Sequence, residues 1–392
     1  MNRSNFYDVH TSHPGLGAAK TEARETRSKW LPLEYKKHVE KILSRADIKI
    51  DGNREWDIRV RDDRFYGTAL LRGSLGLGES YVDGWWDCPS LDQFFARVLS
   101  ASLDRNPLWS WRSGLRWFIS SSFNRQTRSR ATRVAKQHYD LGNNLYQSML
   151  DHRMVYTCAR WQHADNLDDA QEAKLDFVCR KLKLRPGMRI LDIGCGWGSL
   201  LKFAAEKYDV KAVGITLSEQ QLLLARERCA GLRVDICLRD YRDVEGVFDR
   251  VVSLGMFEHV GYANYRKFFE VAHRCLRSHG YFFLSSIGSN HSKHATDPWI
   301  EKYIFPNSYI PSAAEICRGM EGLFAIEGWE NWADDYDRTL QAWFQNFQGH
   351  WQELEPRYGP RFYRMWKCYL MLAAGTFRAR TNHVWEILMV RE

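Results

Sequence analysis

The residues whose types and spacing most clearly suggest chemistry lie at positions 189–198, which read Arg-Ile-Leu-Asp-Ile-Gly-Cys-Gly-Trp-Gly. An apolar run ends in an acid and a glycine-rich turn, and a helical pattern follows at residues 199–208. Such a turn lets a ligand approach bare backbone, and the first amides of the helix carry partial positive charge. The spacing of Gly194, Gly196 and Gly198 differs from the G-x-G-x-x-G pattern of dinucleotide-binding turns. The turn predicts a ligand site, with a purely structural turn before a helix as the alternative.

This glycine spacing is typical of methyltransferases that use S-adenosylmethionine, a cofactor that has a carboxylate but no phosphates. The second strand of such a fold often ends in an acid that accepts hydrogen bonds from the ribose of the cofactor. Here the corresponding strand runs into Ile-Thr-Leu-Ser-Glu-Gln-Gln at residues 215–221. Thr216 and Gln221 can bind ribose hydroxyls as neutral groups, so the sequence predicts a ribose site without a carboxylate.

The stretch that contains the turn alternates regularly between strand and helix patterns. We expect strands at 189–193, 210–216, 234–238, 250–254 and 281–287, and helices at 199–208, 218–230 (with Ser218 as the N-cap) and 264–276. This order requires a doubly wound, mostly parallel sheet of the Rossmann type, which binds ligands beyond the carboxyl ends of its strands. One crevice is therefore expected to collect the side chains at those ends: Asp192, Thr216, Asp240, Glu258 and Ser285.

Length and composition limit the class of protein. The 392 residues suggest two domains, and no run of about 18 apolar residues is present to span a bilayer. Residues 1–29 form a polar segment without a signal-peptide pattern, and we expect a loose tail. The nine cysteines include no C-x-x-C pair, which indicates reduced thiols in a cytoplasm and no zinc or disulfide framework.

The net charge of +8 is concentrated in one segment. Eight Lys or Arg residues and no acids lie in residues 105–139, so the rest of the chain is nearly neutral. The segment also carries apolar residues near helical spacing, at Leu108, Trp111, Leu115, Phe118 and Ile119. A basic helix with an aromatic face suits the interface of an anionic membrane. An interdomain helix with solvated arginines and a nucleic-acid contact are the alternatives.

The chain divides into four predicted segments. After the tail, residues 30–104 are expected to form a small mixed α/β domain, with strands at 48–50 and 58–60 and a helix at 91–103. Residues 105–136 form the basic aromatic linker, and residues 137–392 form the catalytic domain.

Motifs along most of the chain resemble the bacterial cyclopropane fatty acid synthases and, more distantly, the mycolic acid cyclopropane synthases. The resemblance covers roughly residues 43–390 and is specific to this family rather than to methyltransferases in general. In the small domain the motifs are the glycine-rich stretch Gly-Ser-Leu-Gly-Leu-Gly-Glu-Ser-Tyr at 73–81 and Asp-Gly-Trp-Trp at 83–86. The others are Gln-His-Tyr-Asp-Leu-Gly-Asn-Asn at 137–144, Tyr-Thr-Cys at 156–158, the glycine turn, Gly-Met-Phe-Glu-His-Val-Gly at 255–261, Asp-Pro-Trp-Ile-Glu-Lys-Tyr-Ile-Phe-Pro at 297–306 and Phe-Arg-Ala-Arg at 377–380.

The resemblance implies a reaction and its cofactors. A methyl group of S-adenosylmethionine would be transferred to a cis double bond of a phospholipid acyl chain, and a bound bicarbonate ion would remove a proton from the resulting carbocation to close a cyclopropane ring. A methyl-branched or methylene-bearing chain is the close alternative from the same cation. Two different classes of protein compete with these enzymes: a membrane-associated binding protein without activity, and a soluble small-molecule methyltransferase.

Roles for individual residues follow from the same resemblance, and it implies no metal. The catalytic group would be Cys158, Glu258, Ser285, Ile287 through its backbone, and Tyr336. The cofactor would contact Tyr156, Thr157, Asp192, Gly194, Cys195, Gly196, Gly198, Thr216, Leu217, Gln221, Asp240 and Tyr241, with Tyr241 stacked beside the adenine and Asp240 bonded to its amino group. Ser285 stands where many members have a histidine, and its hydroxyl can donate to an oxyanion but cannot carry a charge. His259 is expected to pack or to bond to backbone.

The remaining expectations concern the lipid. An apolar tunnel for the acyl chain is expected from aromatic residues of the C-terminal third: Trp299, Phe305, Trp343, Phe344, Phe347 and Trp366. The small domain and the basic linker would hold the enzyme on unsaturated phospholipids at an anionic surface. We therefore expect a cytoplasmic protein, peripheral on the inner face of the cytoplasmic membrane, with no nucleic-acid partner. A homodimer is implied by the resemblance alone.

Overall fold

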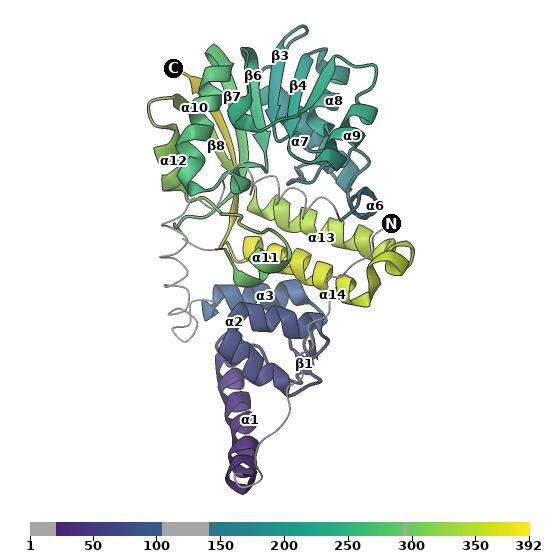
Figure 1. The fold of residues 1–392 in the computed structure, drawn as a ribbon, viewed down its shortest axis with the longest axis vertical. Helices are drawn as coiled ribbons and strands as arrows, with labels where there is room; N and C mark the ends of the chain where they lie inside the picture. Colours follow the sequence, from purple (N-terminus) through teal and green to yellow (C-terminus); the bar gives the residue numbers. More distant parts are fainter. Residues whose placement is uncertain (1–20, 104–140, 293–295) are drawn as a thin grey trace.

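The computed structural model describes residues 21–103, 141–292 and 296–392. An α/β part lies at one end of the long axis, a layer of long helices lies in the middle, and the N-terminal helices lie at the other end (Figure 1). The basic linker and most of the polar tail lie outside the described residues, so the structure does not test the helix predicted there. Within the described residues, no helix is both long enough and apolar enough to cross a membrane.

The α/β part is built on a seven-stranded sheet in the order β5-β4-β3-β6-β7-β9-β8. Strands β3 to β7 pair in parallel, and β9 lies antiparallel between β7 and β8. The predicted doubly wound, mostly parallel sheet is confirmed, and two further strands extend it from the C-terminal third. The strands are β3 Arg189–Ile193, β4 Lys211–Thr216, β5 Val234–Leu238, β6 Phe248–Leu254, β7 Leu276–Gly288, β8 Phe324–Asn331 and β9 His383–Arg391.

Helices cover both faces of this sheet because successive strand residues point to opposite sides. Ile190 and Phe283 pack in one apolar cluster with α7, α8 and α9, whereas Leu191 and Phe282 pack in a second cluster with α10 and α12. Ser218 caps α9 as predicted, accepting a hydrogen bond from the Gln221 amide at 3.2 Å. The helices and short 3-10 turns are α7 Leu167–Lys181, α8 Ser199–Tyr208, α9 Glu219–Arg228, η2 Tyr241–Asp243, η3 Phe257–His259, η4 Tyr262–Asn264, α10 Tyr265–Cys275 and α12 Ala313–Met320.

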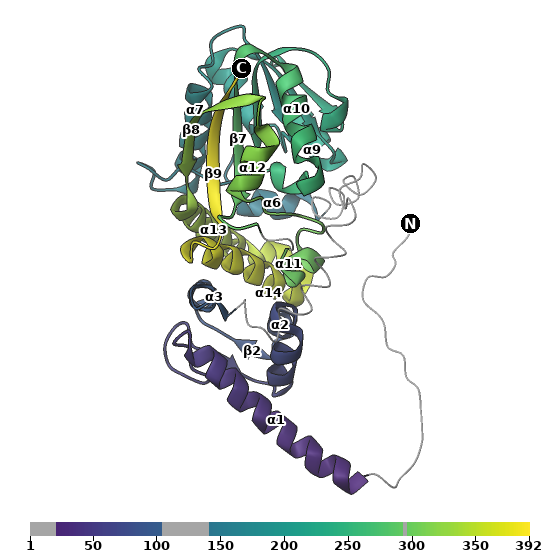
Figure 2. The same ribbon diagram turned by 90° about the vertical axis from the view of Figure 1, so that its left-hand side faces the viewer.

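Two long helices form the layer below the carboxyl ends of the parallel strands (Figures 1 and 2). Helix α14 breaks at Gly359, whose φ of 72° lies in the left-handed region that glycine tolerates. This layer and its neighbours bury most of the aromatic residues of the C-terminal third. The helices are α6 Asn143–Met149, α11 Pro298–Tyr303, α13 Ala333–Gly349 and α14 Trp351–Arg378.

The N-terminal part is more helical than the sequence predicted. Residues 48–50 contribute only an isolated bridge from Ile50 to Ile58, and the 58–60 run yields a two-residue strand. Helices α2 and α3 pack on α14, where the Arg364 guanidinium donates to the Tyr81 carbonyl at 2.7 Å, and α1 packs on α2. The elements are α1 Thr21–Ser44, β1 Arg59–Val60, α2 Arg64–Val82, β2 Trp86–Asp87 and α3 Leu91–Ser100.

The glycine-rich stretch at 73–78 lies within helix α2. The helix kinks at Gly73, which has a φ of 58°. A Cβ atom at Gly78 would lie 2.4 Å from Cδ1 of Trp299, so this glycine lets α11 approach α2 closely. Gly78 therefore lets the N-terminal part pack directly against the catalytic part.

Candidate functional site

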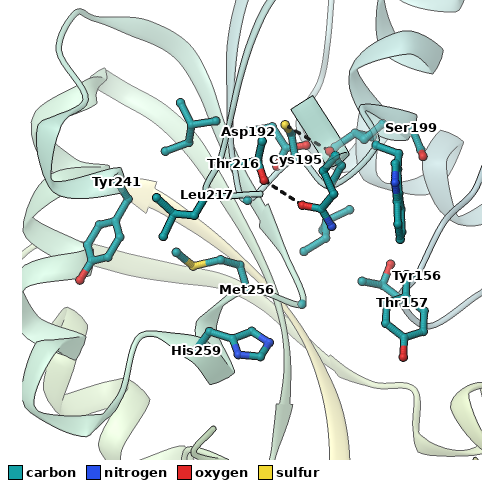
Figure 3. Close-up of a pocket in the computed structure, with 18 of the residues that line it drawn as sticks. Tyr156, Thr157, Asp192, Cys195, Ser199, Thr216, Leu217, Tyr241, Met256 and His259 are labelled. Atoms are coloured by element: carbon teal, nitrogen blue, oxygen red, sulfur yellow. Dashed lines mark hydrogen bonds between the residues drawn. The ribbon is translucent and has the colours of Figure 1, made fainter. Parts of the chain in front are cut away.

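A pocket opens at the carboxyl ends of β3, β4 and β6 (Figure 3). Eleven of the twelve residues predicted to bind the cofactor line it, and they come from four separate chain segments. These eleven are Tyr156, Thr157, Asp192, Gly194, Cys195, Gly196, Thr216, Leu217, Gln221, Asp240 and Tyr241. The structure thus brings this predicted set together, as expected for a crevice beyond the strand ends.

The glycine turn has the backbone geometry that the sequence suggested. Gly194, Gly196 and Gly198 have φ values of 88°, 54° and 78°, all in the left-handed region. A Cβ atom at Gly194 would lie 2.6 Å from the Met256 side chain, whereas one at Gly196 would meet open space. Gly198 is not among the lining residues, because it caps α8 and packs toward Cys229 at its back. Its part is to start the helix rather than to line the pocket.

Asp192 leaves an open acceptor in the pocket. It lies near the end of β3, is only 3% exposed, and its Oδ1 atom has no hydrogen-bond partner among the described residues. Burial raises the pKa of its carboxyl to about 7, although the nearby Lys174 ammonium acts in the opposite direction. A buried, unpaired acceptor is costly, so this atom indicates a ligand that donates hydrogen bonds.

The two neutral residues predicted to bind ribose hydroxyls are held by each other. The Thr216 hydroxyl donates to Oε1 of Gln221 at 2.8 Å, and both side chains are buried (Figure 3). With its oxygen so engaged, the Gln221 side chain presents its amide nitrogen as the donor. The pair therefore holds a fixed polar edge at the end of β4.

The predicted adenine contacts find less support. Both carboxylate oxygens of Asp240 already accept hydrogen bonds from the Arg242 guanidinium, at 2.7 and 2.6 Å. The ring of Tyr241 packs edge-on against Phe268 of α10 at 5.5 Å and points away from the glycine turn (Figure 3). Tyr241 nevertheless lines the pocket, so the stacking beside an adenine stays a prediction.

The five predicted catalytic residues lie around the pocket without lining it. Glu258 belongs to η3, directly after β6, and its Oε1 accepts a hydrogen bond from the Ile287 amide at 2.6 Å. Its Oε2 is buried and has no partner in the described part of the chain. Burial raises the pKa of Glu258 to about 7, so the group is poised between acid and carboxylate near neutral pH.

Cys158 and Tyr336 complete this group from other elements. The Cys158 thiol contacts the Trp332 carbonyl at 3.7 Å, and burial raises its pKa well above the ordinary value. A neutral, buried thiol is a poor nucleophile. Tyr336 of α13 packs against Phe377 at 4.7 Å and against Trp343 at 5.8 Å. These contacts give the site an aromatic wall.

Ser285 does not point its proton at an open site. Its hydroxyl donates to Oε1 of Glu386 on the neighbouring strand β9, at 2.7 Å. The expected hydrogen bond from Ser285 to an oxyanion is therefore not available in this arrangement, because the only proton of the hydroxyl is engaged. Glu386 comes from a strand that the sequence did not predict.

Only some of the aromatic residues expected to line an acyl-chain tunnel lie near the predicted catalytic site. Trp343 packs against Tyr156 at 5.0 Å, and Phe305 packs against Tyr369 at 5.7 Å. Trp299 instead packs between α11 and α2, next to Gly78. Phe344 and Phe347 of α13 contact Lys367 and Tyr363 of α14, whereas Trp366 of α14 packs against Tyr146 of α6 at 6.4 Å.

His259 and Lys174 are two of the pocket-lining residues that the sequence did not assign to the cofactor. His259 was expected to pack or to bond backbone, and its ring does pack edge-on against Phe305 at 5.8 Å. Its Nδ1 atom is also buried without a partner among the described residues, and burial lowers its pKa to about 4, so the ring is neutral. Lys174 of α7 is 2% exposed and donates to the Thr157 hydroxyl at 2.9 Å. A lysine within an otherwise regular amphipathic helix gives no signal of such burial.

Comparisons with known proteins agree with this geometry. The family model described as mycolic acid cyclopropane synthetase matches residues 126–387. The chain is 50% identical over 350 residues to the cyclopropane-fatty-acyl-phospholipid synthase of Escherichia coli K12, which covers 89% of this chain and 92% of that protein. It is 32% identical over 354 residues to the tuberculostearic acid methyltransferase UfaA1 of Mycobacterium tuberculosis, covering 85% and 82%.

Solved structures of cyclopropane synthases resemble this chain as well. The cyclopropane synthase MmaA2 from Mycobacterium tuberculosis has a TM-score of 0.63 at 29% identity, covering 66% of this chain and 98% of that chain. The mycolic acid cyclopropane synthase CmaA1, complexed with SAH and CTAB, has a TM-score of 0.62 at 30% identity, covering 66% and 98%. The residues that the family model matches include every predicted site residue, from Tyr156 to Tyr336.

Proposed function

This chain belongs to the mycolic acid cyclopropane synthetase family, and we propose on this basis that it methylates a cis double bond in an unsaturated phospholipid acyl chain and closes a cyclopropane ring. The observation that carries the proposal is the position of two predicted catalytic residues. Cys158 follows Thr157 and Glu258 precedes His259, and both of those neighbours line the glycine-turn pocket. A methyl donor in the pocket would therefore adjoin the buried catalytic group.

S-adenosylmethionine fits the residues of this pocket. Asp192 offers an unpaired carboxylate oxygen to an ammonium group, and the glycine turn leaves open space at Gly196. Thr216 and Gln221 supply neutral polar groups for ribose hydroxyls. The bound cofactor supplies an electrophilic methyl carbon, and the protein must orient the alkene in line with it.

Aromatic side chains suit the cation that methyl transfer would create on the acyl chain. Tyr156, Tyr336 and Trp343 form a contiguous group, with ring centroids 5.0 Å apart for Tyr156 and Trp343. Aromatic faces attract a cation without forming a bond to it. The Tyr156 hydroxyl is engaged with that of Tyr369 at 2.9 Å, which turns a potential nucleophile toward another hydroxyl.

We propose bicarbonate as the proton acceptor, held by Cys158, Glu258, Tyr336 and the backbone at Ile287. The support is the open Oε2 atom of Glu258 together with its raised pKa, because a protonated carboxyl can donate to an anion that a carboxylate would repel. When bound, this ion supplies a base beside the reacting carbon. Ser285 contributes no donor to it while its hydroxyl is engaged with Glu386.

The test is the product formed from unsaturated phospholipid and isotopically labelled cofactor. Mass spectrometry should show one added methylene unit per reacted chain, and NMR should show ring protons in place of olefinic protons. A Glu258→Gln protein should bind cofactor normally and form little product. Unchanged unsaturation in lipid treated with the wild-type enzyme would refute the proposal.

A methylene-bearing or methyl-branched product is the second candidate. It is favoured by the similarity to UfaA1, described as a tuberculostearic acid methyltransferase, and by Ser285 at a position where the sequence suggested a histidine in relatives. Both outcomes begin with the same methyl transfer. An exocyclic methylene signal in the NMR spectrum, or a new methyl doublet, would identify this product.

We propose that unsaturated phospholipids at an anionic membrane surface are the partner and that the protein is peripheral on the inner face of the cytoplasmic membrane. Support comes from the eight cations within residues 105–139, which lie outside the described structure. Binding to anionic vesicles should be weakened by salt and by joint neutralisation of Arg125, Arg128, Arg130 and Arg133. Salt-insensitive binding would contradict it. A homodimer is also part of the proposal and is tested by molar mass in solution.

A further inference from the structure

Strand β9 adds a second buried carboxyl group beside the predicted catalytic residues. Glu386 is the cross-strand partner of Ser285, and both are nearly inaccessible, at 4% and 6% exposed. The Ser285 hydroxyl donates to Oε1 of Glu386 at 2.7 Å. Because this proton points to Glu386, the Ser285 oxygen has lone pairs left to accept a hydrogen bond from the interior.

Helix α7 places two lysines over this face of the sheet. Lys181 binds Glu330 at 2.7 Å, and Glu330 is the cross-strand neighbour of Glu386 on β8. Lys174, two helical turns earlier, interacts electrostatically with Glu386 and donates to Thr157 at 2.9 Å. The outer pair is a half-exposed ion pair, whereas the inner lysine and glutamate are both buried.

Glu386 also borders the predicted catalytic group. Glu386 interacts electrostatically with the Cys158 thiol and with the Glu258 carboxyl. Burial raises the pKa of Glu386 to about 8, and the hydrogen bond from Ser285 and the charge of Lys174 act in the opposite direction. Glu330 and Glu258 raise it further by repulsion. A carboxyl that titrates near the working pH can take up and release a proton reversibly.

We propose that Glu386 is a positioning residue that accepts, through the hydroxyl of Ser285, the proton released when the ring closes. The inference rests on the proposed function. In the step, the proposed bicarbonate first takes the proton from the reacting carbon and passes it to Oγ of Ser285, which regenerates bicarbonate. The Ser285 Oγ–H bond breaks at the same time, and its proton joins Oε1 of Glu386. The hydroxyl is regenerated, Glu386 ends as the neutral acid, and it returns its proton to solvent between turnovers.

Glu386→Gln tests this assignment with little change of shape, since the amide oxygen can still accept from Ser285. In the wild-type enzyme, kcat should rise with pH as Glu386 loses its proton, because only the carboxylate can accept. In the variant, kcat should fall about 10²-fold and this rise should disappear, with the KM for cofactor unchanged. A fall in kcat that keeps the pH profile would show a packing role and overturn the proposal.

Glu330→Gln is the matched control. It removes one carboxylate from the same sheet face, but both Glu330 oxygens are held, by Lys181 at 2.7 Å and by the Trp332 indole at 3.2 Å. These bonds lower its pKa, so Glu330 stays ionised and takes up no proton. The control should keep the rise of kcat with pH, moved to somewhat lower pH because a charge that repels the Glu386 carboxylate is removed. Loss of the profile in this variant as well would assign the effect to net charge and overturn the proposal.

A spectroscopic titration separates the role of Glu386 from the proposed reaction. Infrared difference spectra of wild-type minus Glu386→Gln protein, without cofactor or lipid, should show a protonated carboxyl band that titrates well above the ordinary glutamate range. Lys174→Met should move that titration to higher pH, since a positive charge is removed. A band that titrates in the ordinary range would overturn the assignment whatever the product. Absence of cyclopropane product with a normal band would instead refute the proposed function.

Discussion

Asp192 should make cofactor binding depend on pH, and Asp192→Asn should remove that dependence. The carboxyl lies near the end of β3, is buried at 3% exposure, and keeps one oxygen without a partner in the described structure. Burial raises its pKa to about 7. An ammonium group of the cofactor would prefer the ionised form, so binding must draw a proton off Asp192 whenever the pH is below this value.

The expected magnitude follows from that pKa. One unit below it, at about pH 6, only about a tenth of the protein carries an ionised Asp192, so cofactor Kd should be about tenfold weaker than at alkaline pH. The effect of rising pH on the free energy of unfolding has the opposite sign to its effect on cofactor binding. Since the pKa is raised on folding, the contribution of Asp192 to the stability of the ligand-free protein is lost as pH rises toward about 7.

Isothermal titration calorimetry with the cofactor or its demethylated product checks the first effect, and thermal unfolding of ligand-free protein checks the second. Asp192→Asn should bind weakly at every pH and should gain stability relative to wild type at alkaline pH. A wild-type Kd that is constant between about pH 6 and about pH 8 would refute the reasoning. So would an asparagine variant with wild-type affinity.

Three further predictions test packing and reactivity. Tyr336→Leu should lower kcat by about tenfold or more with little change in cofactor KM, since a cation–π contact worth about 1–2 kcal/mol is lost. A variant with the kcat of the wild-type enzyme would show that Tyr336 does not act at the site. Gly78→Val should destabilise the protein by about 1–3 kcal/mol in thermal unfolding, because its Cβ atom would meet Trp299 at 2.4 Å. An unchanged melting temperature would mean that α11 does not pack closely against α2. Cys158 should resist alkylation at neutral pH, whereas the exposed Cys317 should be alkylated first, as followed by mass spectrometry. Fast labelling of Cys158 would show that its thiol is accessible to solvent.

Local signals in the sequence predicted much of the α/β part. Period and turn residues located β3 and β5 at the bounds that the structure has, and Ser218 caps α9 as its residue type suggested. The glycine turn was predicted because glycine is the residue that adopts positive φ without strain. These features depend on neighbours within a few residues.

Other features were misjudged or missed because distant packing decided them. The run at 48–50 has strand propensity but only the Ile58 bridge to pair with, and the glycines at 73–78 lie in a helix against which α11 packs. The ring of Tyr241 packs edge-on against Phe268 of α10 as well as lining the pocket. No pattern within a few residues of the sequence predicts contacts between such distant segments.

Short-range periodicity and backbone preference are enough to specify the parallel sheet, the cofactor turn and the residue types at the strand ends, so these could be predicted before the fold was known. The charge and direction of the side chains at those ends depend instead on tertiary contacts. Folding buries Asp192, Glu258 and Glu386 away from water, and it turns the Ser285 hydroxyl to a carboxyl from a strand about a hundred residues further along the chain. Desolvation and pairing across strands set these states, and both depend on which remote segments meet in the fold.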